Sequence, residues 1–159
     1  MAGIELIVNG SRVEVAAAAT TPLLDVLRNE LDLKGTRYGC GLEQCGSCIV
    51  LLDGEPVHAC SREVGTAAGG RITTIEGLGS EDAPHPLQRA FLDEQAGQCG
   101  YCLSGIIMSA KALLDRNPSP TRGDIVRALD KNLCRCGAHP RILRAVEKAA
   151  AMLREGKRP

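Results

Sequence analysis

The chain has 159 residues, with nineteen basic and nineteen acidic side chains that cancel. A net charge of zero gives no field that would attract nucleic acid or an anionic membrane, so neither is expected as a partner. Apolar residues make up 44% of the chain, as in ordinary globular proteins, yet no apolar run approaches the roughly 20 residues that span a bilayer.

The cysteine content predicts the compartment. The N-terminal residues carry no secretory signal, so we expect the eight cysteines to serve as thiolates in the cytoplasm rather than as disulfides. Any association with an inner membrane would then come through partner chains.

The first half of the chain predicts a small mixed β-sheet wrapped on one helix. Strand patterns occur at residues 4–8, 11–17, 48–52, 57–60 and 71–75. Asn9-Gly10 lies between the first two strands and is a strong hairpin signal, and Asp53-Gly54 predicts a second turn. Thr21 is expected to cap a helix that has Pro22 at its first position and that Lys34-Gly35 ends.

Four cysteines in this half have the spacing of plant-type [2Fe–2S] ligands, Cys-x4-Cys-x2-Cys and a later cysteine: Cys40, Cys45, Cys48 and Cys60. Gly41 and Gly46 would let the loop backbone fold closely over a cluster and aim N–H groups at it. A structural zinc site usually has two close cysteine pairs, and a Rieske centre needs two histidines where only His58 is near. The spacing therefore favours an iron–sulfur cluster over zinc or free thiols.

Beyond Gly79 the sequence predicts helices. The polar stretch 80–84 indicates a linker, so we expect one domain over residues 1–79 and another over residues 80–159. Helical patterns run over residues 86–95, 103–116, 121–129 and 142–153. Thr121 and Asp124 form a capping-box pattern at the start of the third helix. The second half is expected to be a compact four-helix unit.

A second set of four cysteines lies at the ends of these helices: Cys99, Cys102, Cys134 and Cys136. Helix N-termini offer unpaired N–H groups and a positive dipole end, both of which favour thiolates. Zinc is a serious alternative here, because Cys-x2-Cys occurs in both kinds of site. The single residue between Cys134 and Cys136 does not match the usual zinc spacing, so we favour a second cluster.

The order of these motifs closely resembles the small iron–sulfur subunit of molybdenum hydroxylases, the xanthine oxidase family. The resemblance covers about residues 3–150 and is carried by the first cysteine pattern, by Gln98-Cys99-Gly100-Tyr101-Cys102 and by Asn132-Leu133-Cys134-Arg135-Cys136-Gly137. Within the family the chain looks most like the small subunits of bacterial nicotinate and isoquinoline dehydrogenases.

The resemblance implies an α+β protein, with an N-terminal β-grasp domain like plant-type ferredoxin and a C-terminal four-helix bundle. The first cluster would be bound by Cys40, Cys45, Cys48 and Cys60, and the second by Cys99, Cys102, Cys134 and Cys136. Gln98 and Cys136 would contact the molybdopterin of a large partner subunit. Electrons would continue to FAD on a medium subunit or to haem c of a cytochrome, while an N-heterocycle such as nicotinate, or an aldehyde, is oxidatively hydroxylated.

The chain itself shows no pattern for substrate chemistry. His58, His85 and His139 are scattered, and the glycines form neither a dinucleotide-binding nor a phosphate-binding loop. The chain is therefore expected to be an electron-transfer subunit with no catalytic residue of its own. Two alternatives stay open from the sequence: a free-standing carrier or sensor with two clusters, and a zinc-stabilised interaction module.

Overall fold

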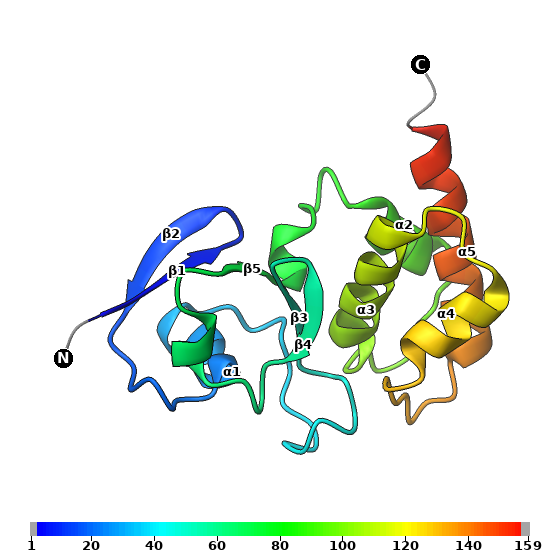
Figure 1. Ribbon diagram of the computed structural model, residues 1–159. Helices are drawn as coiled ribbons and strands as arrows, with labels where there is room; N and C mark the ends of the chain where they lie inside the picture. The colour runs from blue at the N-terminus through cyan, green and yellow to red at the C-terminus, as the bar shows by residue number, and fades with distance from the viewer. Residues whose placement is uncertain (1–2, 157–159) are drawn as a thin grey trace.

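The computed structural model describes residues 3–156, so the predicted domain ends at residues 1 and 159 lie outside the described part. Two units lie side by side: a five-stranded sheet with a short helix, and a group of four helices (Figure 1). This arrangement confirms the predicted α+β fold class. The predicted division at residues 79 and 80 stays a prediction, because Ile75 and Leu78 pack against the core of the helical unit.

The strands all come from the first half of the chain: β1 (Ile4–Val8), β2 (Ser11–Val15), β3 (Ile49–Leu52), β4 (Glu55–His58) and β5 (Arg71–Thr73). The sheet has the order β2-β1-β5-β3-β4. β1 and β5 are parallel and the other neighbours are antiparallel, so the sheet is mixed, as expected for a β-grasp fold. β4 begins and ends two residues earlier than predicted, and Cys60 therefore lies beyond its end.

Both predicted hairpin turns are present. The φ angles are 50° at Asn9 and 83° at Gly10, and 51° at Asp53 and 85° at Gly54. Two successive positive φ angles are the requirement of a type I′ turn, whose twist matches that of the flanking strands. The dipeptides at these turns thus fix the registers of β1 with β2 and of β3 with β4.

The helix predicted between Thr21 and Lys34-Gly35 is partly wrong, and it ends earlier than predicted. Pro22 rather than Thr21 occupies the cap position, and α1 spans Leu23–Asp25 before the chain widens into a π-helical turn over Val26–Glu30. The N–H of Leu31 donates to the carbonyl of Val26 at 3.1 Å, five residues back. Four buried residues of this segment fill the core beneath the sheet: Leu23, Leu24, Val26 and Leu27.

The helices of the second half lie close to their predicted positions: α2 (Pro86–Asp93), α3 (Leu103–Arg116), α4 (Arg122–Leu129) and α5 (His139–Glu155). The capping box of α4 is confirmed, since the N–H of Thr121 donates to Asp124 at 2.8 Å and the N–H of Asp124 donates to the Thr121 hydroxyl at 3.2 Å. Within residues 3–156 no helix is long and apolar enough to cross a membrane.

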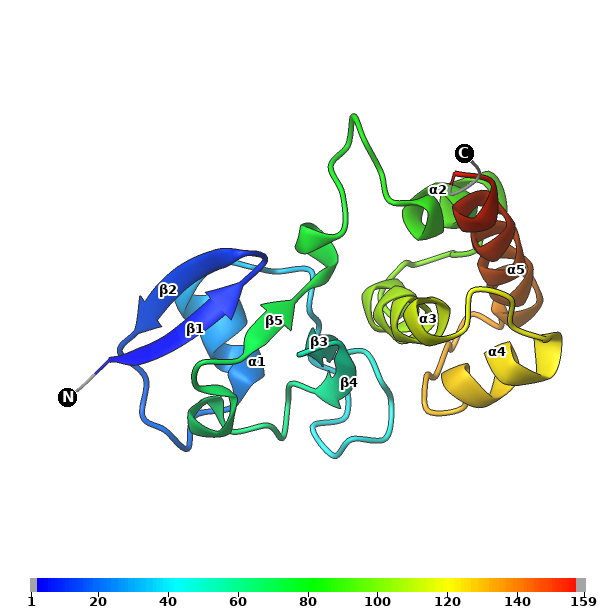
Figure 2. The same ribbon diagram turned by 45° about the horizontal axis from the view of Figure 1, so that its top comes forward.

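Strand β3 joins the two units because both of its faces are buried. Val50 points into the core shared with α1. Ile49 and Leu51 point the other way and pack against Met108 and Ala112 of α3. Figure 2 shows α3 between the sheet and the remaining helices. The unbroken apolar run of β3 is therefore the sequence of a strand covered on both sides.

Candidate iron–sulfur site

The first three cysteines lie on one loop between the α1 segment and β3, and backbone N–H groups of that loop donate to the sulfur atoms of the first two. The N–H groups of Leu42 and Gln44 each donate to the Cys40 sulfur at 3.3 Å, and the N–H of Cys40 donates to the Cys45 sulfur at 3.4 Å. Led by the Leu42 hydrogen bond, these donors lower the pKa of the Cys40 thiol to about 7. The loop therefore favours the thiolate, which is the form that binds metal.

The two glycines predicted for this loop have backbone shapes that need glycine. The φ angle is 69° at Gly41 and 72° at Gly46, in the left-handed region. A Cβ at Gly46 would stand 2.6 Å from the carbonyl oxygen of Lys131, so a side chain there has no room. The turn at Gly41 directs the N–H of Leu42 toward sulfur.

Cys48, the third cysteine of the loop, is close to Cys60. Cys48 is buried at the start of β3, and Cys60 follows β4. Burial raises the pKa of the Cys48 thiol to about 12, and its hydrogen bond with Cys60 opposes ionisation as well. A metal ion that binds Cys48 would have to displace its proton, because the thiolate is the form that binds metal.

The second set is assembled from two loops. Cys99 and Cys102 precede α3, and Cys134 and Cys136 lie between α4 and α5. The Cys99 and Cys136 sulfur atoms are 3.6 Å apart, and Cys102 is hydrogen-bonded to Cys134. Cysteines separated by up to 37 positions in the chain (136 minus 99) thus lie in pairs, and their grouping around one cluster stays a prediction.

The thiols of the second set differ in their tendency to ionise. Burial raises the pKa of the Cys102 thiol to about 12. Burial also opposes ionisation of Cys134, but the N–H groups of Ala138, Cys136 and Gly137 outweigh it and lower the pKa of that thiol. The N–H of Tyr101 lowers the pKa of Cys99. The pair of Cys102 and Cys134 therefore joins a thiol with a raised pKa to one with a lowered pKa.

The eight thiols form four pairs rather than two closed cages. The pairs are Cys40 with Cys45, Cys48 with Cys60, Cys99 with Cys136, and Cys102 with Cys134. Among residues 3–156, no three Cys, His, Asp or Glu side chains are close enough together to hold one metal ion. A two-iron cluster needs two thiolates on each iron, with the sulfides between the pairs, so the paired arrangement fits it better than a single zinc ion.

Buried polar atoms near the thiols also fit a bound group. In the described part of the chain, three buried side-chain atoms have no hydrogen-bond partner: His58 Nε2, Ser104 Oγ and Asn132 Oδ1. Each belongs to a residue two positions from a predicted ligand (Cys60, Cys102 and Cys134). Buried polar groups are normally satisfied, so unpaired atoms this near the cysteines in sequence fit sites that a bound group completes.

Gln98 joins the two loops of the second set. Its exposed side chain donates from Nε2 to the carbonyl of Cys136 at 3.1 Å. A pocket of about 470 Å³ begins beside Gln98 and is lined by apolar side chains of α2 and α3, including Phe91 and Leu103. A second pocket of about 430 Å³ lies over Cys99, Cys134 and their neighbours. The contact of Gln98 and Cys136 with a partner's molybdopterin stays a prediction.

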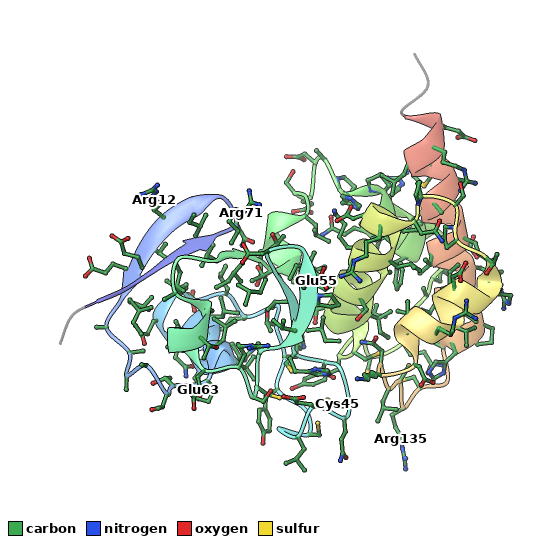
Figure 3. All side chains as sticks on the ribbon, viewed as in Figure 1. Arg12, Cys45, Glu55, Glu63, Arg71 and Arg135 are labelled. Carbon is green, nitrogen blue, oxygen red and sulfur yellow. The ribbon has the colours of Figure 1, made fainter. Side chains whose placement is uncertain are left out.

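The two thiol sets are direct neighbours, which the sequence did not indicate. The N–H of Leu133, next to Cys134, donates to the carbonyl of Cys45 at 3.0 Å. The Tyr101 hydroxyl donates to the carbonyl of Tyr38, and the Arg37 guanidinium lies 5.1 Å from the centre of the Tyr101 ring. Figure 3 shows Cys45 and Arg135, one from each loop region, at the same edge of the molecule. The position of Tyr101 inside the second cysteine motif is the signal that could have indicated such a contact.

Comparison with known proteins decides between the remaining interpretations. The family described as "2Fe-2S iron-sulfur cluster binding domain" matches residues 6–71, and the family described as "[2Fe-2S] binding domain" matches residues 74–147. A nicotinate dehydrogenase subunit of Pseudomonas putida is 57% identical over 96% of this chain and 97% of its own length. The alpha subunit of isoquinoline 1-oxidoreductase from Brevundimonas diminuta is 49% identical over 92% and 97%.

The chain belongs to the [2Fe–2S] subunits of molybdenum hydroxylases. Solved structures agree: quinoline 2-oxidoreductase from Pseudomonas putida has a chain that matches with a TM-score of 0.92 at 34% identity, covering 98% of both chains. The aldehyde oxidoreductase of Desulfovibrio desulfuricans matches with a TM-score of 0.94 at 44% identity, and there this chain spans 18% of a longer one.

Family membership confirms several predictions. The chain is an iron–sulfur component of an oxidoreductase, it carries two [2Fe–2S] clusters, and its role is electron transfer. The zinc-stabilised module kept open from the sequence loses its support, because both matched families bind [2Fe–2S] clusters.

Proposed function

We propose that this chain relays electrons from the molybdenum centre of a large partner subunit, through its two clusters, to FAD or a cytochrome c. The observation that carries the proposal is the contact between the two thiol sets, where the main chain of Cys45 accepts a hydrogen bond from the residue beside Cys134. Two redox groups held this close can pass an electron without leaving the chain. A chain with one isolated cluster would have no use for such a contact.

The proposed ligands are the eight cysteines, four to each cluster. Cys40, Cys45, Cys48 and Cys60 would hold the first cluster, and Cys99, Cys102, Cys134 and Cys136 would hold the second. The thiol pairs suggest which two cysteines share each iron. A bound [2Fe–2S] cluster accepts and releases one electron at a time, and the N–H groups of Leu42, Gln44 and Tyr101 would stabilise the charge on its sulfur ligands.

The second cluster is proposed to face the molybdenum subunit. Gln98 and Cys136 would contact the molybdopterin, and the exposed side chain of Gln98 beside an apolar pocket is available for such a contact. Electrons would leave from the first cluster, whose loop at Gly41 and Gly46 carries the exposed side chain of Leu42. An apolar, glycine-containing surface of this kind suits a docked electron acceptor.

The substrate is proposed to be an electron-poor N-heterocycle of the nicotinate type. Support comes from the relatives named for nicotinate and isoquinoline, which match over nearly the whole chain. An aldehyde is the other candidate, because a relative named aldehyde oxidoreductase is 44% identical. The acceptor, FAD on a medium subunit or haem c, would belong to another chain. The cytoplasm stays the proposed compartment, since all eight cysteines are free to act as ligands.

Co-purification and single-turnover reduction test this function. A relay subunit should travel with a molybdopterin-containing chain, whereas a free-standing carrier would purify alone with both cluster signals. Cys45→Ser should slow reduction of the final acceptor and leave reduction of molybdenum by substrate intact. Cys136→Ser should also impair docking to the molybdenum subunit. Equal effects of both variants on docking and on acceptor reduction would contradict the proposed order.

A further inference from the structure

The contact between the two thiol sets depends on one small patch of backbone. Gly46 lies between Cys45 and Cys48 in the first loop, and its carbonyl faces the helical unit. The buried side chain of Asn132 donates from Nδ2 to this carbonyl at 3.3 Å. One residue further along the chain, the N–H of Leu133 donates to the carbonyl of Cys45 at 3.0 Å. Two adjacent carbonyls of the first loop are thus held by two adjacent residues of the second.

The first turn of α3 packs directly against the same carbonyl. A Cβ placed on Gly105 would lie 1.9 Å from the carbonyl oxygen of Gly46 and 2.9 Å from its carbonyl carbon. Both are backbone atoms, so they cannot swing aside as a flexible side chain could. Gly105 is the third residue of α3, and Cys102 is the cap residue of that helix. The closeness of the helix to the first loop therefore requires glycine at residue 105.

We propose that Gly105 and Asn132 are positioning residues that set the distance between the two clusters, and with it the rate of electron exchange between them. The inference rests on the proposed ligand assignment. Gly46 lies one residue from Cys45 and two from Cys48, Gly105 lies three residues from Cys102, and Asn132 lies two from Cys134. A shift at this patch is passed to ligands of both clusters. Electron tunnelling falls exponentially with distance, so even a small separation should slow the exchange.

The test uses the full chain carrying both clusters, in the variants Gly105→Ala and Asn132→Ala. Gly123→Ala is the matched control, because Gly123 is also a helical glycine and its Cβ would first meet the flexible end of Arg127 at 3.4 Å. Low-temperature EPR of the dithionite-reduced protein measures the magnetic coupling between the clusters, which depends on their separation. Hydrogen exchange of the Leu133 amide measures the contact itself.

We expect Gly105→Ala to weaken the coupling and to slow inter-cluster electron exchange several-fold, with both cluster signals retained. Asn132→Ala should act in the same direction and speed exchange of the Leu133 amide. Gly123→Ala should match the parent chain. If either variant retains both clusters and shows unchanged coupling and unchanged Leu133 exchange, the positioning role is overturned. If the parent chain shows no pair of [2Fe–2S] signals, the ligand assignment fails instead.

Discussion

The two thiol sets reach a similar arrangement in different ways. In the first set, three cysteines and the N–H donors to two of their sulfur atoms come from one loop, residues 40–48. In the second set, two loops meet only because α3, α4 and α5 pack together around a common core. The first site is therefore specified mainly by local sequence, and the second by tertiary packing.

Removing one cysteine from each set should have the largest effect, and it distinguishes the two sites. Cys48→Ala and Cys102→Ala should each lose one [2Fe–2S] EPR signal and about half of the iron, since a cluster needs all four thiolates. Cys102→Ala should lower the melting temperature more, because the second cluster closes a longer stretch of chain. Iron analysis, EPR and thermal circular dichroism measure these effects. Equal melting temperatures for the two variants would contradict the expected difference between the two sites.

Gly46→Ala tests how much of the first site depends on its fit to the helical unit. Alanine at a positive φ angle costs about 1–2 kcal/mol, and the overlap with the Lys131 carbonyl should raise the loss of unfolding free energy to about 2–4 kcal/mol. Gly10→Ala is the matched control, with a φ of 83° and open space around it. It should lose only the about 1–2 kcal/mol of unfolding free energy that comes from the positive φ angle. Urea unfolding measures both variants, and equal losses would show that the overlap relaxes freely.

A pH effect is expected at α2, in the helical unit. Neutral His85 caps this helix by accepting the N–H of Leu87 on Nδ1 at 3.1 Å, and burial, aided by Lys111 and opposed by Asp115, lowers the pKa of His85. The unfolded chain therefore binds the proton first as the pH falls below about 6.5. The contribution of the cap to stability is complete above this pH and is lost toward the lower pKa of the folded state. The loss should not exceed about 1 kcal/mol, the usual contribution of a cap.

His85→Asn provides the control for this effect, because asparagine can cap a helix without titrating. The unfolding free energy of both chains is measured at about pH 7.5 and about pH 5.5, which bracket the ordinary histidine pKa. Between these two pH values the parent chain should lose more unfolding free energy than His85→Asn. If the unfolding free energies of the two chains change equally with pH, the titration of His85 does not affect stability.

The smallest effect is expected for the ion pair of Arg116 and Glu55, which links α3 to β4. Both side chains are more than half exposed, at 55% and 67%, so a double-mutant cycle should give a coupling energy of about 0–1 kcal/mol. A larger coupling would mean that surface charges, as well as the apolar contact of β3 with α3, hold the two units together.

Local signals account for what the sequence predicted. Asn9-Gly10 and Asp53-Gly54 have the backbone shapes of hairpin turns, and Thr121 caps α4 as its pattern indicates. The spacing of Cys40, Cys45 and Cys48 likewise describes a loop whose geometry needs few distant contacts. Family membership confirms the two clusters, while the individual ligands remain predictions supported by the thiol pairs.

The differences arise where tertiary contacts override a local pattern. The sequence Thr21-Pro22 suggested an ordinary capped helix. The N–H groups of Leu23 and Leu24 instead donate to the distant carbonyls of Arg62 and Ala59, and the segment widens into a π-helical turn after Asp25. Gly105 and Asn132 gave no signal alone, because their importance depends on a carbonyl at Gly46, which is 59 and 86 positions away (105 minus 46, 132 minus 46). No local pattern encodes a distance of that kind.

The two buried faces of strand β3 determine whether the two units can be separated. Val50 packs in one core, while Ile49 and Leu51 pack against α3. Cutting the chain after the sheet would therefore expose the apolar side chains of Ile49 and Leu51 to water. Each fragment alone would then tend to stick to its neighbours. Natural shuffling of these two modules should accordingly keep them as an inseparable tandem.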